Sequence, residues 1–172
     1  MFDTILCPVD GSDHARKAET IAINLAKTYG ANLIFLHAMM TQASSSDLER
    51  FAEVEGLTRH VEPAIRHLKS LEGRLEYGYE EQPVGSRVYA EIGQKILDDA
   101  KLDAETAGVT KVDTILSDSG DTADQILRAA KRREADCIVM GTRGLSDMKA
   151  LMLGSVSHKV VNHASCTCIA VK

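Results

Sequence analysis

Tryptophan is absent from the chain, and phenylalanine and tyrosine together make up only 4% of it. Few rings are therefore available on which the bases of a single-stranded nucleic acid could stack. The sequence has no long basic run and a formal net charge of -5, which also argues against nucleic acid as a partner. No apolar run reaches the ~18 residues of a membrane span, and no cationic segment precedes the first apolar residues. We therefore expect a cytoplasmic protein that binds neither nucleic acid nor membrane.

Cysteine is also sparse, and its positions do not indicate a metal site. The four cysteines lie in or beside apolar, strand-like runs, at Cys7, Cys137, Cys166 and Cys168. A single Cys-x-Cys pair without a second ligand pair falls short of a zinc framework. We expect buried structural thiols, with Cys166 and Cys168 on the same face of a strand.

The apolar residues that are present follow an alternation of strands and helices. Hydrophobic residues form 44% of the 172 residues, enough for the core of one domain, and we expect residues 1–172 to form a single domain. Strands are predicted over residues 3–9, 33–38, 112–116, 136–140 and 166–171. Helices are predicted over residues 13–29, 121–133 and 155–164, the first ended by Gly30. This order predicts an α/β fold, an open doubly wound parallel sheet with helices on both faces.

About seventy residues separate the second and third predicted strands, far more than the ~10 to 12 that a crossover requires. Two helical stripes fall in this stretch, one from Val61 to Leu71 and one from Val88 to Ala107. We expect a helical insertion over residues 41–110. Packing against the core is the favoured role of its stripes, and a lid that closes on a ligand is the alternative.

Three glycines, Gly141, Gly144 and Gly154, follow the fourth predicted strand and lead into the last predicted helix. Glycine allows a sharp turn and a close approach to a ligand, and the free N–H groups at a helix N-terminus attract anions. The N–H groups from Gly154 to Ser157 are thus predicted to hold phosphate. A single glycine more often marks a turn than a binding site.

These motifs resemble the ATP-binding subclass of the universal stress protein family. The opening run Ile5-Leu6-Cys7-Pro8-Val9-Asp10-Gly11-Ser12 is similar to the start of that family, and the glycine loop follows its pattern G-x2-G-x9-G-[ST] without a gap. The resemblance implies a five-stranded sheet of order 3-2-1-4-5 and a homodimer formed through the last strand, residues 166–171. Thr122 and Thr167 depart from the family, because prolines often stand there.

The resemblance also implies an ATP site, with Mg²⁺ or Mn²⁺ held through the phosphates and no confident metal ligand from a protein side chain. Asp10 and the backbone of Val9 and Ala38 would face the adenine and ribose, and Met140 and Gly141 would line the sugar. The phosphates would be held by Arg143, Gly144, Gly154, Ser155, Val156 and Ser157. The implied nucleotide-binding residues are Pro8, Val9, Asp10, Gly11, Ser12, Ala38, Met140, Gly141, Arg143, Gly144, Gly154, Ser155, Val156 and Ser157.

Two residues have alternative roles that are purely structural. Asp10 could simply close the Asp-Gly-Ser turn or cap the following helix, and His37 lies inside an apolar strand, as expected of a core histidine rather than a catalyst.

Three functions remain open at this point. The leading one is a nucleotide-dependent regulatory or stress-response protein. A slow ATP hydrolase is the second, although the sequence has neither a Walker lysine nor a recognisable general base paired with a nucleophile, and we assign no catalytic residue. A protein-interaction module that works through residues 41–110 is the third.

Overall fold

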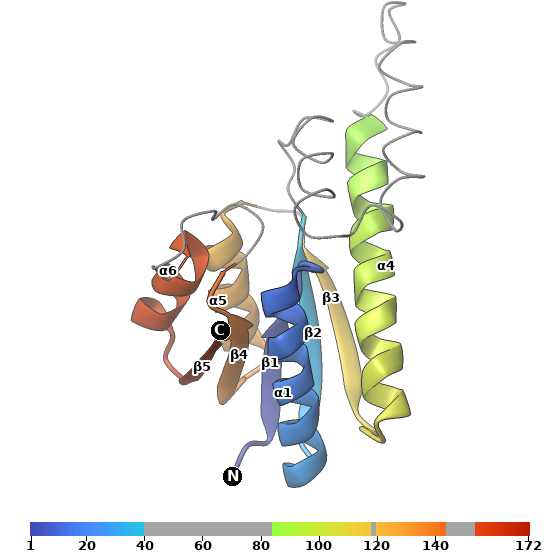
Figure 1. Cartoon of the computed structure of the whole chain (residues 1–172). Helices are drawn as coiled ribbons and strands as arrows, with labels where there is room; N and C mark the ends of the chain where they lie inside the picture. The colour runs from blue at the N-terminus through green and yellow to red at the C-terminus, as the bar shows by residue number, and fades with distance from the viewer. Residues whose placement is uncertain (40–83, 118–119, 144–153) are drawn as a thin grey trace, which may run out of the picture.

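A computed structural model of the chain describes residues 1–39, 84–117, 120–143 and 154–172 (Figure 1). Its five strands form one parallel sheet in the order β3-β2-β1-β4-β5, as predicted. The strands are β1 (Thr4–Pro8), β2 (Asn32–Ala38), β3 (Val112–Ser117), β4 (Cys137–Gly141) and β5 (Thr167–Val171). The described helices are α1 (Asp13–Tyr29), α4 (Val84–Thr106), α5 (Thr122–Arg132) and α6 (Ser155–His163).

Helices cover both faces of the sheet, so the predicted doubly wound architecture is confirmed. One core cluster packs α1 and α4 against the face that carries Ile5, Phe35 and Val139. The other packs α5 and α6 against the face that carries Leu6 and Ile138. Successive strand residues alternate between the two clusters because side chains alternate across a strand. The central strands therefore read as continuous apolar runs, as expected for a buried parallel sheet.

Local signals set the ends of α1. The hydroxyl of Ser12 accepts a hydrogen bond from the Ala15 N–H (3.2 Å), which satisfies one of the free donors of the first turn. Gly30 ends the helix in the left-handed conformation (φ 67°), and its N–H donates to the carbonyl of Ala26. A stripe of small side chains faces the sheet and lets the helix approach it closely: Ala15, Ala18, Ala22 and Ala26.

The second stripe of the predicted insertion forms α4, which is the crossover helix between β2 and β3. Its buried residues Leu97, Ala100 and Ala104 pack in the same core cluster as α1. The first stripe, from Val61 to Leu71, lies in residues 40–83, outside the described residues. The insertion or lid predicted over residues 41–110 therefore falls largely outside them as well. Among the helices that the structure describes, none is long and apolar enough to cross a bilayer.

The four cysteines are free thiols with unequal burial. Cys7 and Cys137 are completely buried, and burial raises the pKa of the Cys137 thiol to about 11. Cys166 and Cys168 are only partly buried and pack against the same core cluster, on one face as predicted. The expectation of buried thiols is therefore correct for the two of the central strands, whereas the two beside or in β5 are only partly buried because β5 is an edge strand.

Candidate functional site

The candidate site lies where the winding of the sheet changes direction, beyond the carboxyl ends of β1 and β4. These neighbouring strands pair through Ile5 with Cys137 and Leu6 with Ile138. After β1 the chain enters α1 on one face, and after β4 it leads to α6 on the other (Figure 1). Such a switch point is where doubly wound sheets bind their ligands.

A tight turn follows β1 at the residues predicted to face the nucleoside. Asp10 Oδ1 accepts a hydrogen bond from the Ser12 N–H (3.0 Å), and Gly11 between them has φ 84°, a conformation that favours glycine. Arg16 Nη2 donates to the Gly11 carbonyl (3.1 Å). Asp10 thus closes the turn, the alternative role that the sequence left open, and its role toward a ligand stays a prediction.

The backbone of Val9 is already used inside the protein. Its N–H donates to the Leu36 carbonyl (2.8 Å), and its carbonyl lies 2.8 Å from Nδ1 of His37. His37 is buried, and burial lowers its pKa, so the neutral ring donates its Nδ1–H to Val9 near pH 7. His37 is the core histidine that the sequence predicted. One lone pair of the Val9 carbonyl is left for a ligand.

Gly141 is needed for packing. A Cβ at this position would lie 3.0 Å from the backbone carbon of His14 and 3.0 Å from the Arg143 carbonyl oxygen. The first turn of α1 therefore approaches the end of β4 too closely for a side chain. The absence of a side chain thus makes room for α1, and the role of Gly141 toward a ligand stays a prediction. The fold thus brings His14 beside a residue that lies 127 positions later in the chain.

The side chain of Met140 does not line the crevice. It is 4% exposed and belongs to the core between the sheet and helices α5 and α6. Only the backbone of Met140 can face a ligand there. Arg143 is partly exposed just beyond β4, and Ala38 is partly exposed at the end of β2. Gly144 lies outside the described residues.

Thr142 anchors the start of α6 through its carbonyl oxygen. That oxygen accepts hydrogen bonds from the Gly154 N–H (2.8 Å) and from the Ser157 hydroxyl (2.8 Å). The Ser157 hydroxyl also lies 2.9 Å from the Gly154 carbonyl, and the residue is 2% exposed. Two of the predicted phosphate donors, the Gly154 N–H and the Ser157 hydroxyl, are thus committed to internal bonds. Thr142 lacked any local signal beyond its place directly after a strand.

The donors that remain at α6 point beyond its first turn. The N–H groups of Ser155, Val156 and Ser157 have no acceptor within the helix, and the glycine at the N-cap adds no side-chain cap. Ser155 is exposed. The N-termini of α1 and α6 follow neighbouring strand ends, so both helix dipoles make the crevice attractive to an anion. Among the residues that the structure describes, no three His, Cys, Asp or Glu side chains group to hold a metal ion.

Comparison with known proteins places this geometry in a family. Residues 1–172 match the universal stress protein family. The chain is 34% identical to "Universal stress protein YxiE" of Bacillus subtilis, with the whole of both chains covered. It is 36% identical to a universal stress protein of Thermus aquaticus, again with both chains covered completely.

Solved structures of similar fold agree with this assignment. The universal stress protein UspA of Lactobacillus plantarum matches with a TM-score of 0.65 and 24% identity, covering 99% of this chain and 97% of that one. A universal stress protein in complex with cAMP matches at 0.63 and 22% identity, covering 99% and 97%. One from Archaeoglobus fulgidus in complex with dAMP matches at 0.61 and 17% identity, covering 100% and 98%. The chain belongs to the universal stress protein family.

Proposed function

We propose that the chain is a cytoplasmic, nucleotide-dependent regulatory protein that binds ATP in the crevice between β1 and β4. The observation that carries the proposal is the anchored N-terminus of α6. Thr142 holds Gly154 and Ser157 in place, and the N–H groups of Ser155, Val156 and Ser157 have no acceptor within the helix. A preformed row of donors at a helix N-terminus suits a phosphate chain.

The family comparisons support an adenine nucleotide as the ligand. Two similar folds were solved with cAMP and with dAMP, and both ligands carry an adenine and a phosphate. The glycine pattern from Gly141 to Ser155 is the one that the ATP-binding subclass uses. ATP is the ligand that suits this glycine pattern, the N–H donors of α6 and the cationic Arg143.

Each part of the crevice has a role in this proposal. The N–H groups of Ser155, Val156 and Ser157, together with Arg143, bind the phosphates. Asp10 accepts hydrogen bonds from the ribose hydroxyls while it keeps the turn closed through Oδ1. The small side chain of Ala38 leaves space at the end of β2 for the adenine. A bound Mg²⁺ or Mn²⁺ would neutralise phosphate charge and is held by phosphate oxygens.

A direct binding experiment tests this function. Nucleotide released from the purified protein by denaturation is identified by chromatography, and calorimetry then gives the Kd of added Mg-ATP. Asp10→Asn keeps an oxygen for the Ser12 N–H and removes the charge, so we expect a folded variant that binds ATP about 10- to 100-fold more weakly, the equivalent of ~1.5 to 3 kcal/mol.

Asp98→Asn is the matched control, because Asp98 is exposed on α4 and bonds only to Gln94 among the described contacts. It should bind like the unaltered chain. The proposal fails if no nucleotide copurifies and no heat of ATP binding is measured. Rapid ATP turnover that a single carboxylate change abolishes would instead establish the hydrolase alternative.

We also propose that the chain forms a homodimer through β5. Thr167 donates to Asp136, and the Thr142 N–H donates to Val171, so the odd-numbered residues of β5 bond to β4. The backbone groups of Cys168 and Ala170 therefore point away from the sheet. An open parallel edge with small side chains invites pairing with a second strand.

A further inference from the structure

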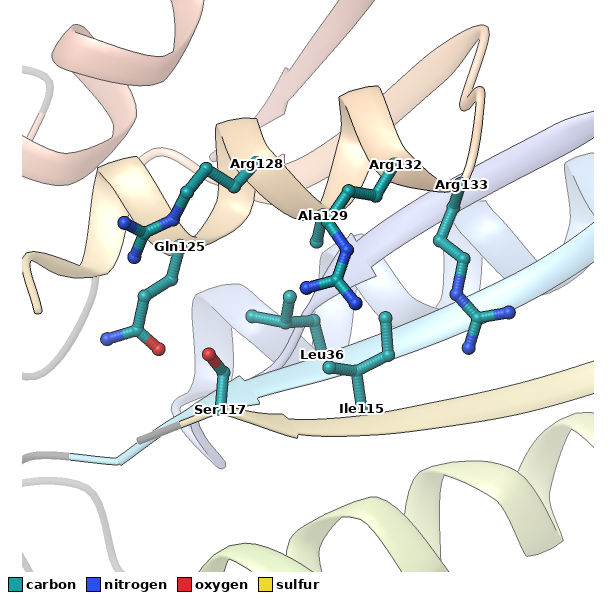
Figure 2. A pocket seen from close by; sticks show the side chains of 8 residues that line it. All are labelled: Leu36, Ile115, Ser117, Gln125, Arg128, Ala129, Arg132 and Arg133. Carbon is teal, nitrogen blue, oxygen red and sulfur yellow. The ribbon is translucent and has the colours of Figure 1, made fainter. Parts of the chain in front are cut away.

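A second pocket lies away from the crevice, between α5 and the edge of the sheet at β3. It has a volume of 170 Å³, far more than the ~10 to 15 Å³ that one water requires. Figure 2 shows its lining side chains converging from α5 on one side and from β2 and β3 on the other. We call it the α5–β3 pocket, lined by Leu36, Ile115, Ser117, Gln125, Arg128, Ala129, Arg132 and Arg133.

Gln125 carries a buried acceptor without a partner among the described residues. The residue is 3% exposed, and its Nε2 donates to the Gly120 carbonyl (2.7 Å). The end of the amide that faces the Gly120 carbonyl must be the nitrogen, because only its N–H groups can donate to a carbonyl oxygen. The other end is therefore Oε1. Oε1 is buried and has no hydrogen-bond partner in the part of the chain that the structure describes. Figure 2 shows the Gln125 amide directed into the pocket, toward the Ser117 hydroxyl. A buried acceptor aimed into a cavity calls for a donor on a ligand.

Two arginines on α5 and one directly after it give the same pocket a positive charge. Arg128, Arg132 and Arg133 all line it. Arg133 also pairs with Asp113 on β3 (3.5 Å), whereas Arg132 has no carboxylate partner within the described residues. A guanidinium binds carboxylate or phosphate with two parallel hydrogen bonds. Arg132 is therefore the group best placed to bind an anion.

The remaining lining is apolar. Leu36 and Ile115 on the strands and Ala129 on α5 form the surface between Arg132 and the Gln125–Ser117 end. A ligand that fits all three features has an apolar body, an acidic group at one end and an O–H or N–H donor at the other. Pockets for small molecules combine mainly apolar walls with a few converging polar groups in this way.

We propose that the α5–β3 pocket binds a small organic anion of this kind, a hydroxylated or aminated carboxylate or phosphate monoester. The anion lies against Arg132, and the donor reaches Gln125 Oε1. None of the residues that line this pocket is among those assigned to the crevice. We therefore expect its ligand to bind in addition to ATP.

The test uses the full chain and four defined probes. Binding of each probe is measured by ¹H–¹⁵N NMR titration. 4-Hydroxybenzoate and 4-hydroxyphenyl phosphate carry the ring, the donor and either kind of anion, and they show which acid the pocket prefers. Benzoate lacks the donor, and 4-hydroxybenzamide lacks the charge. We expect saturable shifts of the Gln125 side-chain amide and the Ala129 backbone with a hydroxylated anion, at least fivefold weaker binding of benzoate, and no saturation with the amide.

Arg132→Gln is expected to weaken binding of the hydroxylated anion at least tenfold. Lys17→Gln, which removes an exposed positive charge on α1, is expected to leave it unchanged, and saturating ATP is expected not to compete. The proposal is overturned if neither hydroxylated anion saturates, if the uncharged amide binds equally well, or if ATP displaces the probe. Since the comparison among the four probes needs no variant, it decides the matter even if Arg132→Gln does not fold.

Discussion

Thr142 shows how one backbone group can organise a site that its own side chain does not form. Its N–H extends the sheet by donating to the Val171 carbonyl (2.7 Å), while its carbonyl holds both Gly154 and Ser157. The start of α6 is thus tied to the end of the sheet through a single peptide. Replacing Ser157 by alanine would remove one of these ties, so it is a change to the scaffold as well as to the proposed phosphate site.

Glu19 is a residue whose charge the fold disfavours. It lies on α1, partly buried, and faces Asp103 and Asp99 of α4. Burial, with the repulsion of these carboxylates, raises the pKa of Glu19 to about 7, while Arg16 opposes the rise. The folded protein therefore holds a proton on Glu19 at pH values where the unfolded chain has lost it.

This shift makes a prediction about pH and stability. Between pH 4.5 and 7 the native state binds more protons at Glu19 than the unfolded state does, so the free energy of unfolding falls as pH rises through this window. Glu19→Gln removes the penalty, and at pH 8 we expect it to raise the free energy of unfolding by about 1 kcal/mol, after allowance for solvent screening. Urea unfolding at pH 4, 6 and 8 measures the effect.

Glu91→Gln is the control, because Glu91 is an exposed glutamate of α4. It should leave the pH dependence as it is. Equal effects of the two changes at pH 8, or a gain for Glu19→Gln that is largest at pH 4, would contradict the assignment.

At the scale of the element, helix α4 contains a glycine, Gly93, because it packs closely against β2 and β3 at that position. Glycine within a helix costs about 1 kcal/mol relative to alanine. At Gly93 a Cβ would lie 2.6 Å from Cδ2 of His37 and 2.7 Å from Cδ1 of Leu116. The helix therefore gives up intrinsic stability so that the His37 ring can fit beneath it and reach the Val9 carbonyl.

The edge strand β5 carries the prediction about assembly. Ala170→Pro removes an N–H that points away from β4 and leaves the β4 bonds of Ile169 and Val171 in place, and proline is tolerated on edge strands. If β5 pairs with a second copy, this change should convert a dimer into a folded monomer, measured by sedimentation equilibrium. Ala170→Val keeps the N–H and should remain dimeric. A dimer that survives Ala170→Pro unaltered would show that the interface lies elsewhere.

At the scale of the whole molecule, the crevice joins segments from opposite layers. α1 begins on one face of the sheet and α6 on the other, and each presents its N-terminus near the same pair of strand ends. A ligand bound to both holds the two layers together. Its binding energy therefore adds to the stability of the entire fold, because the unfolded chain has no such site.

Thermal unfolding with ATP measures this coupling. At a free ATP concentration 100 times the Kd, ligand binding adds ~2.7 kcal/mol. For a chain of this size that corresponds to a rise in Tm of about 5 to 10 °C. Asp10→Asn at the same ATP concentration should show a smaller rise, since its Kd is higher. A Tm that does not depend on ATP concentration would rule out a site shared between the two layers.

Much of the fold could be predicted because its signals are local. Ser12 and Gly30 mark the ends of α1, continuous apolar runs mark the buried strands, and the resemblance in the glycine loop indicated the strand order. The place of the candidate site followed from the same order, because a doubly wound sheet has a definite switch point. The α5–β3 pocket had no such signal, since its residues come from β2, β3 and α5.

The sequence by itself determined which elements form and where a ligand would be expected. Only the tertiary structure decided which groups are still available there. Gly141 accommodates His14, the Ser157 hydroxyl bonds to Thr142, and Val9 uses its N–H and one lone pair of its carbonyl inside the protein. The physical reason is that periodicity and capping act between neighbours along the chain. Hydrogen-bond partners and close contacts are chosen in space, among residues that the sequence separates.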